Sequence, residues 1–125
     1  MIDTIADLIN RINNAKGASH KTLELPYSNP KLAILAVLKK EGYIADFTDQ
    51  KEAKTIVINL DGAPRVFKKI NRLSRPGRRF YVNSRNIPRP KGGYGIVVIS
   101  TPKGILSGEV ARKNHVGGEV MCEVY

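Results

Sequence analysis

A chain of 125 residues, 42% of them hydrophobic and 26% charged, has the composition of an ordinary globular protein that can bury one core or two small ones. Its formal net charge of +10 is not ordinary, and it indicates a polyanionic partner: a nucleic acid, an anionic membrane surface or an acidic protein. The single cysteine, the acidic start and the short longest apolar run, residues 32–38, argue against disulfides, a signal peptide and a membrane span, so we expect a cytoplasmic protein.

The first half of the chain predicts alternating helices and strands. A first helix is indicated by apolar residues at helical spacing, Ile5, Leu8, Ile9 and Ile12. A strand over residues 22–27 leads to a second helix, which Asn29 caps and Pro30 opens. The buried stripe of this helix is expected to be Leu32, Leu35, Ala36 and Leu38. Two strands, residues 43–47 and 55–60, complete an α-β-α-β-β order.

The second half is predicted to be mostly β. Residues 61–64, Asp-Gly-Ala-Pro, indicate a boundary, after which strands are expected over residues 65–73, 79–82, 96–99 and 119–125. Residues 75–78 suit a type II turn, residues 83–93 an exposed connection, and Ser107 caps a short helix that ends near residue 114. We therefore expect an α+β protein of two small packed domains, residues 1–63 with the α/β layer and residues 64–125 with the mostly antiparallel β domain.

No pattern in the sequence predicts an enzyme. His20 and His115 do not stand at metal-ligand spacing with Cys122 or with a carboxylate, and Cys122 itself has the setting of a buried packing residue. The glycine-rich residues 92–95 precede a strand and do not open a helix, unlike a phosphate-binding loop. We expect no catalytic residue, no metal, no cofactor and no small-molecule substrate.

The net positive charge lies entirely in the second half. Residues 1–62 carry eight basic and eight acidic side chains, whereas residues 63–125 carry thirteen basic and three acidic ones. A basic hairpin is followed by Phe80, expected in the core, and Tyr81; its cations and those of the next connection are Lys68, Lys69, Arg72, Arg75, Arg78, Arg79, Arg85, Arg89 and Lys91. No acidic residue lies between residues 65 and 101, which favours a phosphate-binding surface over an idle charged face.

A short hydroxyl-bearing segment follows the apolar strand. Residues 100–104, Ser-Thr-Pro-Lys-Gly, have two hydroxyls that can recognise base edges or 2′-hydroxyls in the shallow minor groove of RNA. A generic turn before a helix has the same pattern, so spacing alone does not decide between the two interpretations.

Four segments, in order along the whole chain, resemble the bacterial ribosomal protein S8 family of the small subunit. Residues 3–15 resemble its first helix, residues 38–44 and 74–81 its middle, and residues 99–104 with 111–112 and 117–120 its C-terminal signature. The resemblance implies a primary binder of the central domain of 16S ribosomal RNA, located in the ribosome beside other small-subunit proteins. It also implies that some members repress translation of their own operon by binding its mRNA.

The resemblance also implies roles for particular residues. Ser100, Thr101 and Gly104 would contact RNA, with Lys103 and Tyr81 beside them, and Glu119 would orient that loop. A second RNA helix would be contacted by polar residues of the first half, Arg11, Asn14, Ser28 and Lys31. This sequence departs from the family at Pro102, which replaces a usually polar residue, and in the short stretch between residues 47 and 55, which predicts a tight hairpin.

Two alternatives remain at this point. A non-ribosomal nucleic-acid-binding regulator would prefer duplex DNA to structured RNA. An adaptor for membranes or acidic proteins requires a basic amphipathic helix, whereas the cations here fall on expected strands and turns. In the ribosomal interpretation, Lys and Arg side chains supply most of the affinity by binding phosphates, and residues 100–104 discriminate among folded RNAs.

Overall fold

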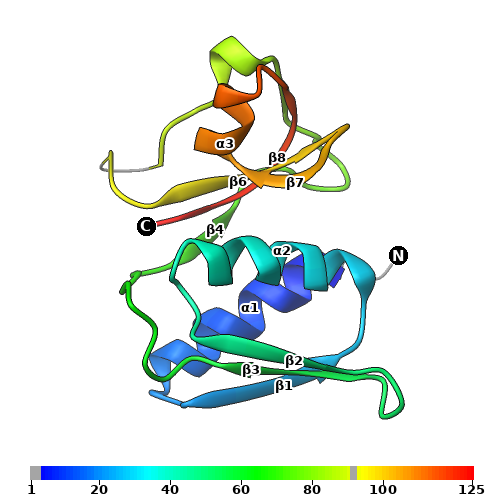
Figure 1. The fold of residues 1–125 in the computed structure, drawn as a ribbon, viewed down its shortest axis with the longest axis vertical. Helices are drawn as coiled ribbons and strands as arrows, with labels where there is room; N and C mark the ends of the chain where they lie inside the picture. The colour runs from blue at the N-terminus through cyan, green and yellow to red at the C-terminus, as the bar shows by residue number, and fades with distance from the viewer. Residues whose placement is uncertain (1–3, 91–92) are drawn as a thin grey trace. The chain divides into compact units, whose positions relative to one another are not determined.

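The computed structural model describes residues 4–90 and 93–125 (Figure 1). The chain divides into two compact units, Met1–Val66 (unit 1) and Phe67–Tyr125 (unit 2). The described residues form three α-helices and two antiparallel sheets, which confirms the expected α+β class. The domain boundary expected after residue 63 stays a prediction, because compactness does not test whether residues 64–125 fold independently.

Unit 1 is a three-stranded sheet with two helices on one face. Its elements are α1 (Thr4–Gly17), β1 (Thr22–Pro26), α2 (Asn29–Lys40), β2 (Asp46–Gln50) and β3 (Thr55–Asn59). The antiparallel strands have the order β1-β3-β2, with α1 against β1 and α2 against β2 (Figure 1). The core between the two layers includes Ile12, Leu35, Ile56 and Ile58, each fully buried. Period-2 alternation puts Ile56 and Ile58 on the same face of β3, which explains why this strand was predictable.

Several expectations for unit 1 were wrong in detail. The strand expected over residues 43–47 begins only at Asp46, because Gly42 takes a left-handed φ of 87° and the Tyr43 N–H bonds the Leu38 carbonyl to end α2. The N-cap of α2 is Ser28 and not Asn29. On α2, Ala36 is exposed and Ile34 and Val37 are buried instead. The connection from β2 to β3 has four residues, 51–54, so the tight hairpin is confirmed.

Unit 2 is a sheet with one short helix on one face. Its elements are β4 (Ile70–Arg72), β5 (Tyr81–Val82), the 3-10 helix η1 (Ser84–Asn86), β6 (Ile96–Thr101), β7 (Gly104–Ser107), α3 (Gly108–Lys113) and β8 (Gly118–Val124). The antiparallel order is β4-β8-β6-β7, and β5 also pairs with β8, so β8 is the strand to which three others bond. Ile99, Ala111 and Val120 belong to the core between the sheet and α3.

Expectations for unit 2 also needed correction. Of the strand expected over residues 65–73 only Ile70–Arg72 forms, and β7 was not expected at all. Gly77 has no positive φ, so residues 75–78 do not form a type II turn. Phe80, expected in the core, is 38% exposed. The cap at Ser107 is confirmed, because its hydroxyl accepts the Val110 N–H.

Two further sequence expectations concern Cys122 and the membrane. Cys122 is buried as expected, and this burial raises the pKa of its thiol to about 12. Within residues 4–90 and 93–125, no helix has the length and apolarity needed to cross a membrane.

Candidate nucleic-acid interface

Residues 100–104 form the hairpin turn between β6 and β7, and not a turn that leads directly into a helix. Thr101 pairs with Gly104, so Pro102 and Lys103 are the two loop residues, and both are exposed. Proline has a fixed negative φ and Lys103 has no positive φ, so the left-handed conformation falls on Gly104, at 112°. Pro102, the departure from the family pattern, therefore stiffens this turn.

The two hydroxyls of this turn differ in their hydrogen bonds. The Thr101 hydroxyl donates to the Gly104 carbonyl at 2.8 Å and accepts the Lys103 N–H at 3.1 Å. Its only proton is thus used inside the turn. The Ser100 hydroxyl has no hydrogen-bond partner among the described residues, and Ser100 is half-buried. Ser100 is the member of this pair whose hydroxyl remains free to donate to a ligand.

Strand pairing brings three predicted site residues into one row. Glu119 on β8 lies opposite Tyr81 on one side and opposite Ser100 on the other. The side chains of residues directly opposite each other in an antiparallel sheet point to the same face, and their Cβ atoms lie about 5 Å apart. Because Ile99 and Val120, the adjacent positions, pack toward α3, this row lies on the other face of the sheet.

The Glu119 side chain binds a second turn, which the sequence did not connect with it. Its Oε2 atom accepts hydrogen bonds from the Ser74 hydroxyl and, at 3.0 Å, from Arg79 Nη1. The Ser74 hydroxyl also accepts the Phe80 N–H at 3.1 Å. These bonds close residues 74–80, here called the arginine turn. Ser74 was not predicted as a site residue, because its partner lies 45 positions away and no local pattern signals the contact.

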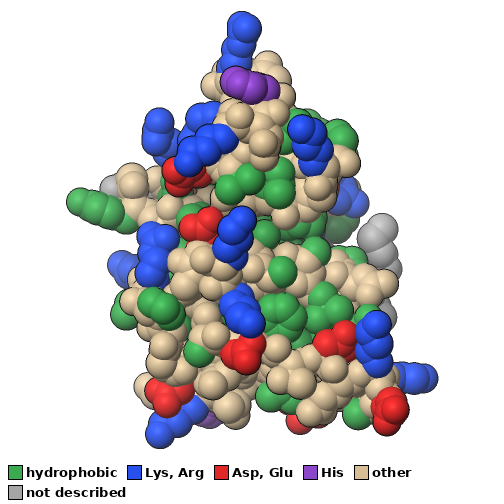
Figure 2. All heavy atoms as spheres, in the orientation of Figure 1, with side chains coloured by type: hydrophobic (Ala, Val, Ile, Leu, Met, Phe, Trp, Pro, Cys, Tyr) green, Lys and Arg blue, Asp and Glu red, His purple; other side chains and the backbone are tan. Residues whose placement is uncertain are grey.

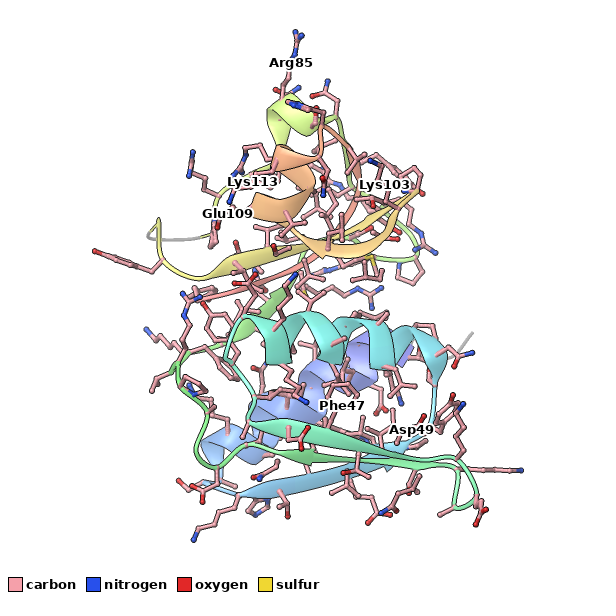
Figure 3. All side chains as sticks on the ribbon, in the orientation of Figure 1. Phe47, Asp49, Arg85, Lys103, Glu109 and Lys113 are labelled. Atoms are coloured by element: carbon pink, nitrogen blue, oxygen red, sulfur yellow. The ribbon has the colours of Figure 1, made fainter. Side chains whose placement is uncertain are left out.

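The other predicted cations of unit 2 are spread over its surface. Arg85 projects from η1, away from the β6–β7 turn that carries Lys103 (Figure 3). Arg89 is exposed on the segment between η1 and β6, and Lys91 lies outside the described residues. Lys113, which was not a predicted site residue, pairs with Glu109 on α3 at 3.4 Å. The β6–β7 turn and the arginine turn are the two candidate sites that the sheet connects, through Glu119.

In unit 1, two of the four predicted site residues, Lys31 and Arg11, are bonded within the unit. Lys31 is 2% exposed, and its Nζ bonds the Asp7 carboxylate at 3.3 Å and the Pro26 carbonyl at 3.2 Å. Arg11 Nε bonds the same carboxylate at 2.9 Å and is the main cause that lowers the pKa of Asp7. A buried ammonium with these partners has no route to a phosphate, so this geometry does not support Lys31 as an RNA-binding residue.

Arg11, Asn14 and Ser28 remain at the surface of unit 1, the last of them half-buried. The unit as a whole is close to neutral, with nine basic and eight acidic residues, whereas unit 2 has twelve basic and three acidic ones. In Figure 2, acidic and basic side chains accordingly lie side by side over β2 and β3. Unit 2 is therefore the stronger candidate for binding a polyanion.

The model of the family described as ribosomal protein S8 matches residues 3–125. A Roseiflexus castenholzii protein is 46% identical over 98% of this chain and 97% of its own length. A Kosmotoga olearia protein is 45% identical over 98% of both chains, and a Hahella chejuensis protein is 45% identical over 100% of this chain and 98% of its own. Each of these relatives is named small ribosomal subunit protein uS8.

Proposed function

The chain belongs to the ribosomal protein S8 family. We propose that it binds the central domain of 16S ribosomal RNA directly and organises that domain during assembly of the small subunit. Membership makes the protein a structural component of the small ribosomal subunit, located in the ribosome in the cytoplasm, and not an enzyme. Its partners are ribosomal RNA and other small-subunit proteins. The alternative of a non-ribosomal regulator is thereby set aside.

The observation that carries the proposal is the row of Tyr81, Glu119 and Ser100 across three strands, beside an exposed hairpin turn. A sheet holds these groups in fixed register, which suits recognition of a folded RNA by shape. The free Ser100 hydroxyl and the Tyr81 side chain, which is 67% exposed, are the donor and the aromatic surface of this row. In RNA-binding proteins, hydroxyl groups of this kind hydrogen-bond to 2′-hydroxyls, and aromatic side chains stack on unpaired bases.

Charge supplies the affinity in this proposal. Arg75, Arg78 and Lys103 are exposed on the two turns that flank the row. Each phosphate that such a side chain binds releases condensed counterions, so affinity falls steeply with salt. Phosphate contacts set the position of the protein on the RNA, and contacts from the row distinguish one folded RNA from another.

The test is equilibrium binding of the full chain to separate transcripts of the 5′, central and 3′ domains of 16S rRNA at one salt concentration. The proposal expects binding to the central domain to be at least tenfold tighter than to the others, within the specificity range of nucleic-acid-binding proteins. Equal affinity for the three transcripts would contradict it.

We propose in addition that the same surface binds a structured segment of the mRNA of the protein's own operon. One surface cannot bind two RNAs at once, so this mRNA should displace the central-domain transcript competitively. Simultaneous binding of both RNAs would rule out a shared site.

A further inference from the structure

The arginine turn and the end of β4 enclose a groove in unit 2. None of the three residues of the row across the sheet lines this groove. The groove has a volume of about 550 Å³ and is lined by Arg72, Leu73, Arg75, Arg78, Arg79 and Phe80. Ligand pockets have volumes of roughly 300–1,000 Å³, so this groove has the size for one small group and not for a duplex.

The lining residues divide into fixed and free side chains. Arg72 Nε bonds the Ser74 carbonyl, and Arg79 bonds Glu119, so these two guanidinium groups are held within the protein. The side chains of Arg75 and Arg78 have no hydrogen-bond or ion-pair partner among the described residues. Every charged residue that lines the groove is an arginine. Two free guanidinium groups beside two fixed ones favour a ligand with negative charge.

The turn that carries the free arginines is fixed by backbone and buried side-chain bonds. Arg75 and Arg78 exchange two backbone hydrogen bonds, of 3.1 and 2.9 Å. Ser74 is only 1% exposed, and its hydroxyl joins the Glu119 carboxylate to the Phe80 N–H. The groove therefore exists before any ligand arrives, which reduces the entropy lost on binding.

Phe80 gives the groove an apolar aromatic side. Its 38% exposure is unusual for phenylalanine in a protein of this size, and Leu73 beside it is packed against the core of unit 2. A bare phosphate would be bound by the arginines without any aromatic group. A nucleotide has both parts, a phosphate and a flat base that stacks on an aromatic ring.

We propose, on the basis of the function proposed above, that this groove binds one unpaired nucleotide of the RNA, with its phosphate at Arg75 and Arg78 and its base against Phe80. The groove is too small for paired bases, so a bulged or looped nucleotide is the group that enters. The β6–β7 turn and the row across the sheet would bind elsewhere on the same RNA. The arginine turn thus selects for a local defect in the RNA helix.

The experiment compares two short RNA hairpins, identical except that one has a single bulged 2-aminopurine, a fluorescent base that is quenched when it stacks. The full-length wild type is expected to bind the bulged hairpin roughly tenfold more tightly, within the range known for one base–aromatic stack, and to quench its fluorescence. The Phe80→Leu variant should lose both the preference and the quenching, whereas Phe80→Tyr should keep them.

Two control variants separate this stack from general effects. Tyr94 is 84% exposed and does not line the groove, so Tyr94→Leu should keep the preference for the bulge. Arg78→Ala should weaken binding of both hairpins, because the phosphate contact is shared. Thermal unfolding of each variant shows whether the fold is intact. If Phe80→Leu fails to fold, the wild type and Phe80→Tyr are compared instead. Quenching of the bulged base by both supports the groove, and quenching by neither overturns it.

The outcomes distinguish this inference from the proposed function. A wild type that binds the central-domain transcript but shows no bulge preference and no quenching overturns the nucleotide groove alone. An acidic peptide of the same net charge is added as a competitor. If it displaces the bulged hairpin equally well from the wild type and from Phe80→Leu, the nucleotide groove is also overturned. A wild type that binds no 16S rRNA domain selectively overturns the proposed function.

Discussion

Ser100 and Thr101 are neighbours on β6, yet only one of them has a hydroxyl proton to give to RNA. The Thr101 proton bonds the Gly104 carbonyl inside the turn, and the Ser100 hydroxyl is free among the described residues. The family resemblance assigns both to RNA contact without distinguishing them. In the structure Thr101 holds the turn through its two hydrogen bonds, and we propose Ser100 as the residue that donates to RNA.

Ser100→Ala should therefore weaken binding to the central-domain transcript by about 1–3 kcal/mol, the scale of a base-specific contact, and leave the unfolding temperature unchanged. Thr101→Val keeps the shape of the side chain but removes both bonds, so it should lower stability by about 0.5–1.5 kcal/mol as well as affinity. Thermal unfolding and filter binding measure the two effects. Equal loss of stability in both variants would contradict the division of roles.

Asp7 offers a pH test of the ion pairs in unit 1. The hydrogen bond from Arg11 is the largest cause that lowers the pKa of its carboxyl, with Lys31 also contributing. The stability that Asp7 supplies is fully present above its unfolded pKa of about 3.9 and is lost as the pH falls through its lower folded pKa. Asp7→Asn should be less stable than the wild type at neutral pH and should approach it in acid.

Urea unfolding at a series of pH values between neutral and strongly acidic measures this convergence. The magnitude is expected to be small, because the Asp7 side chain is 35% exposed and solvent screens the pair. A constant difference between wild type and Asp7→Asn at all pH values would show that the charge of Asp7 is not responsible.

Sequence patterns predicted the helices and strands that depend on local periodicity or on a capping residue. They missed the strands that depend on pairing between distant parts of the chain. The spacing of Ile5 to Ile12 predicted α1, and Ser107 predicted the start of α3. The four-residue strand β7 was missed, because its partner β6 and the Thr101–Gly104 pair define it more than its own sequence does. The strand expected from residue 65 was too long, because the N–H groups of Lys68 and Lys69 share one acceptor, the Tyr125 carbonyl.

The sequence allowed us to predict which residues could contact RNA, but not which of them lie together in the structure. The hydroxyls of residues 100–104 and the basic hairpin were visible in the sequence. Their connection through Glu119 depends on β8 lying between β5 and β6, which no local pattern encodes. For the same reason the burial of Lys31 was missed, since its partner Asp7 lies on another helix.

Gly118 shows how closely β8 approaches the site. A Cβ atom on Gly118 would lie 1.9 Å from the Ser100 carbonyl oxygen, so Gly118→Ala must displace β6 at Ser100. We expect a loss of stability of about 1–3 kcal/mol, as for other overpacked positions, together with weaker RNA binding. Gly17→Ala is the matched control, because its Cβ would meet nothing within 4 Å, its φ is not positive and it lies at the end of α1 in unit 1, outside the proposed interface.

Gly17→Ala should change the free energy of unfolding by no more than about 1 kcal/mol and should leave the RNA affinity within about twofold of wild type. Differential scanning calorimetry and filter binding of the two alanine variants make the comparison. A Gly118→Ala protein with the stability and affinity of Gly17→Ala would show that the contact with Ser100 is relaxed in solution.

For the whole molecule, the net charge of +10 matters less than where it is placed. Unit 2 carries nearly all of the excess, but its cations do not share one face: Arg85 and Lys103 project in different directions (Figure 3). The total charge alone would predict that every cation contributes alike to RNA binding. The structure predicts that exposed cations on the two turns contribute and that a buried cation does not.

Arg78→Ala and Lys31→Met remove the same charge from an exposed and a buried position. In plots of log affinity against log salt, Arg78→Ala should reduce the slope by about one unit, and Lys31→Met should leave the slope unchanged. The variants are compared at a temperature where both are folded. Equal reductions in slope would mean that long-range charge, and not phosphate contact, governs the affinity.

The proposed binding to the central domain is tested most directly by locating the β6–β7 turn on the RNA. Cys122 is buried with a raised thiol pKa, so Lys103→Cys supplies the one reactive thiol among the described residues, to which an iron chelate that generates hydroxyl radicals can be attached. With protein-free 16S rRNA, we expect cleavage from residue 103 to be confined to the central domain. The same chelate at Glu52→Cys, in the hairpin of unit 1, should give no cleavage there. Cleavage of the central domain from residue 52 but not from residue 103 would contradict the proposed binding.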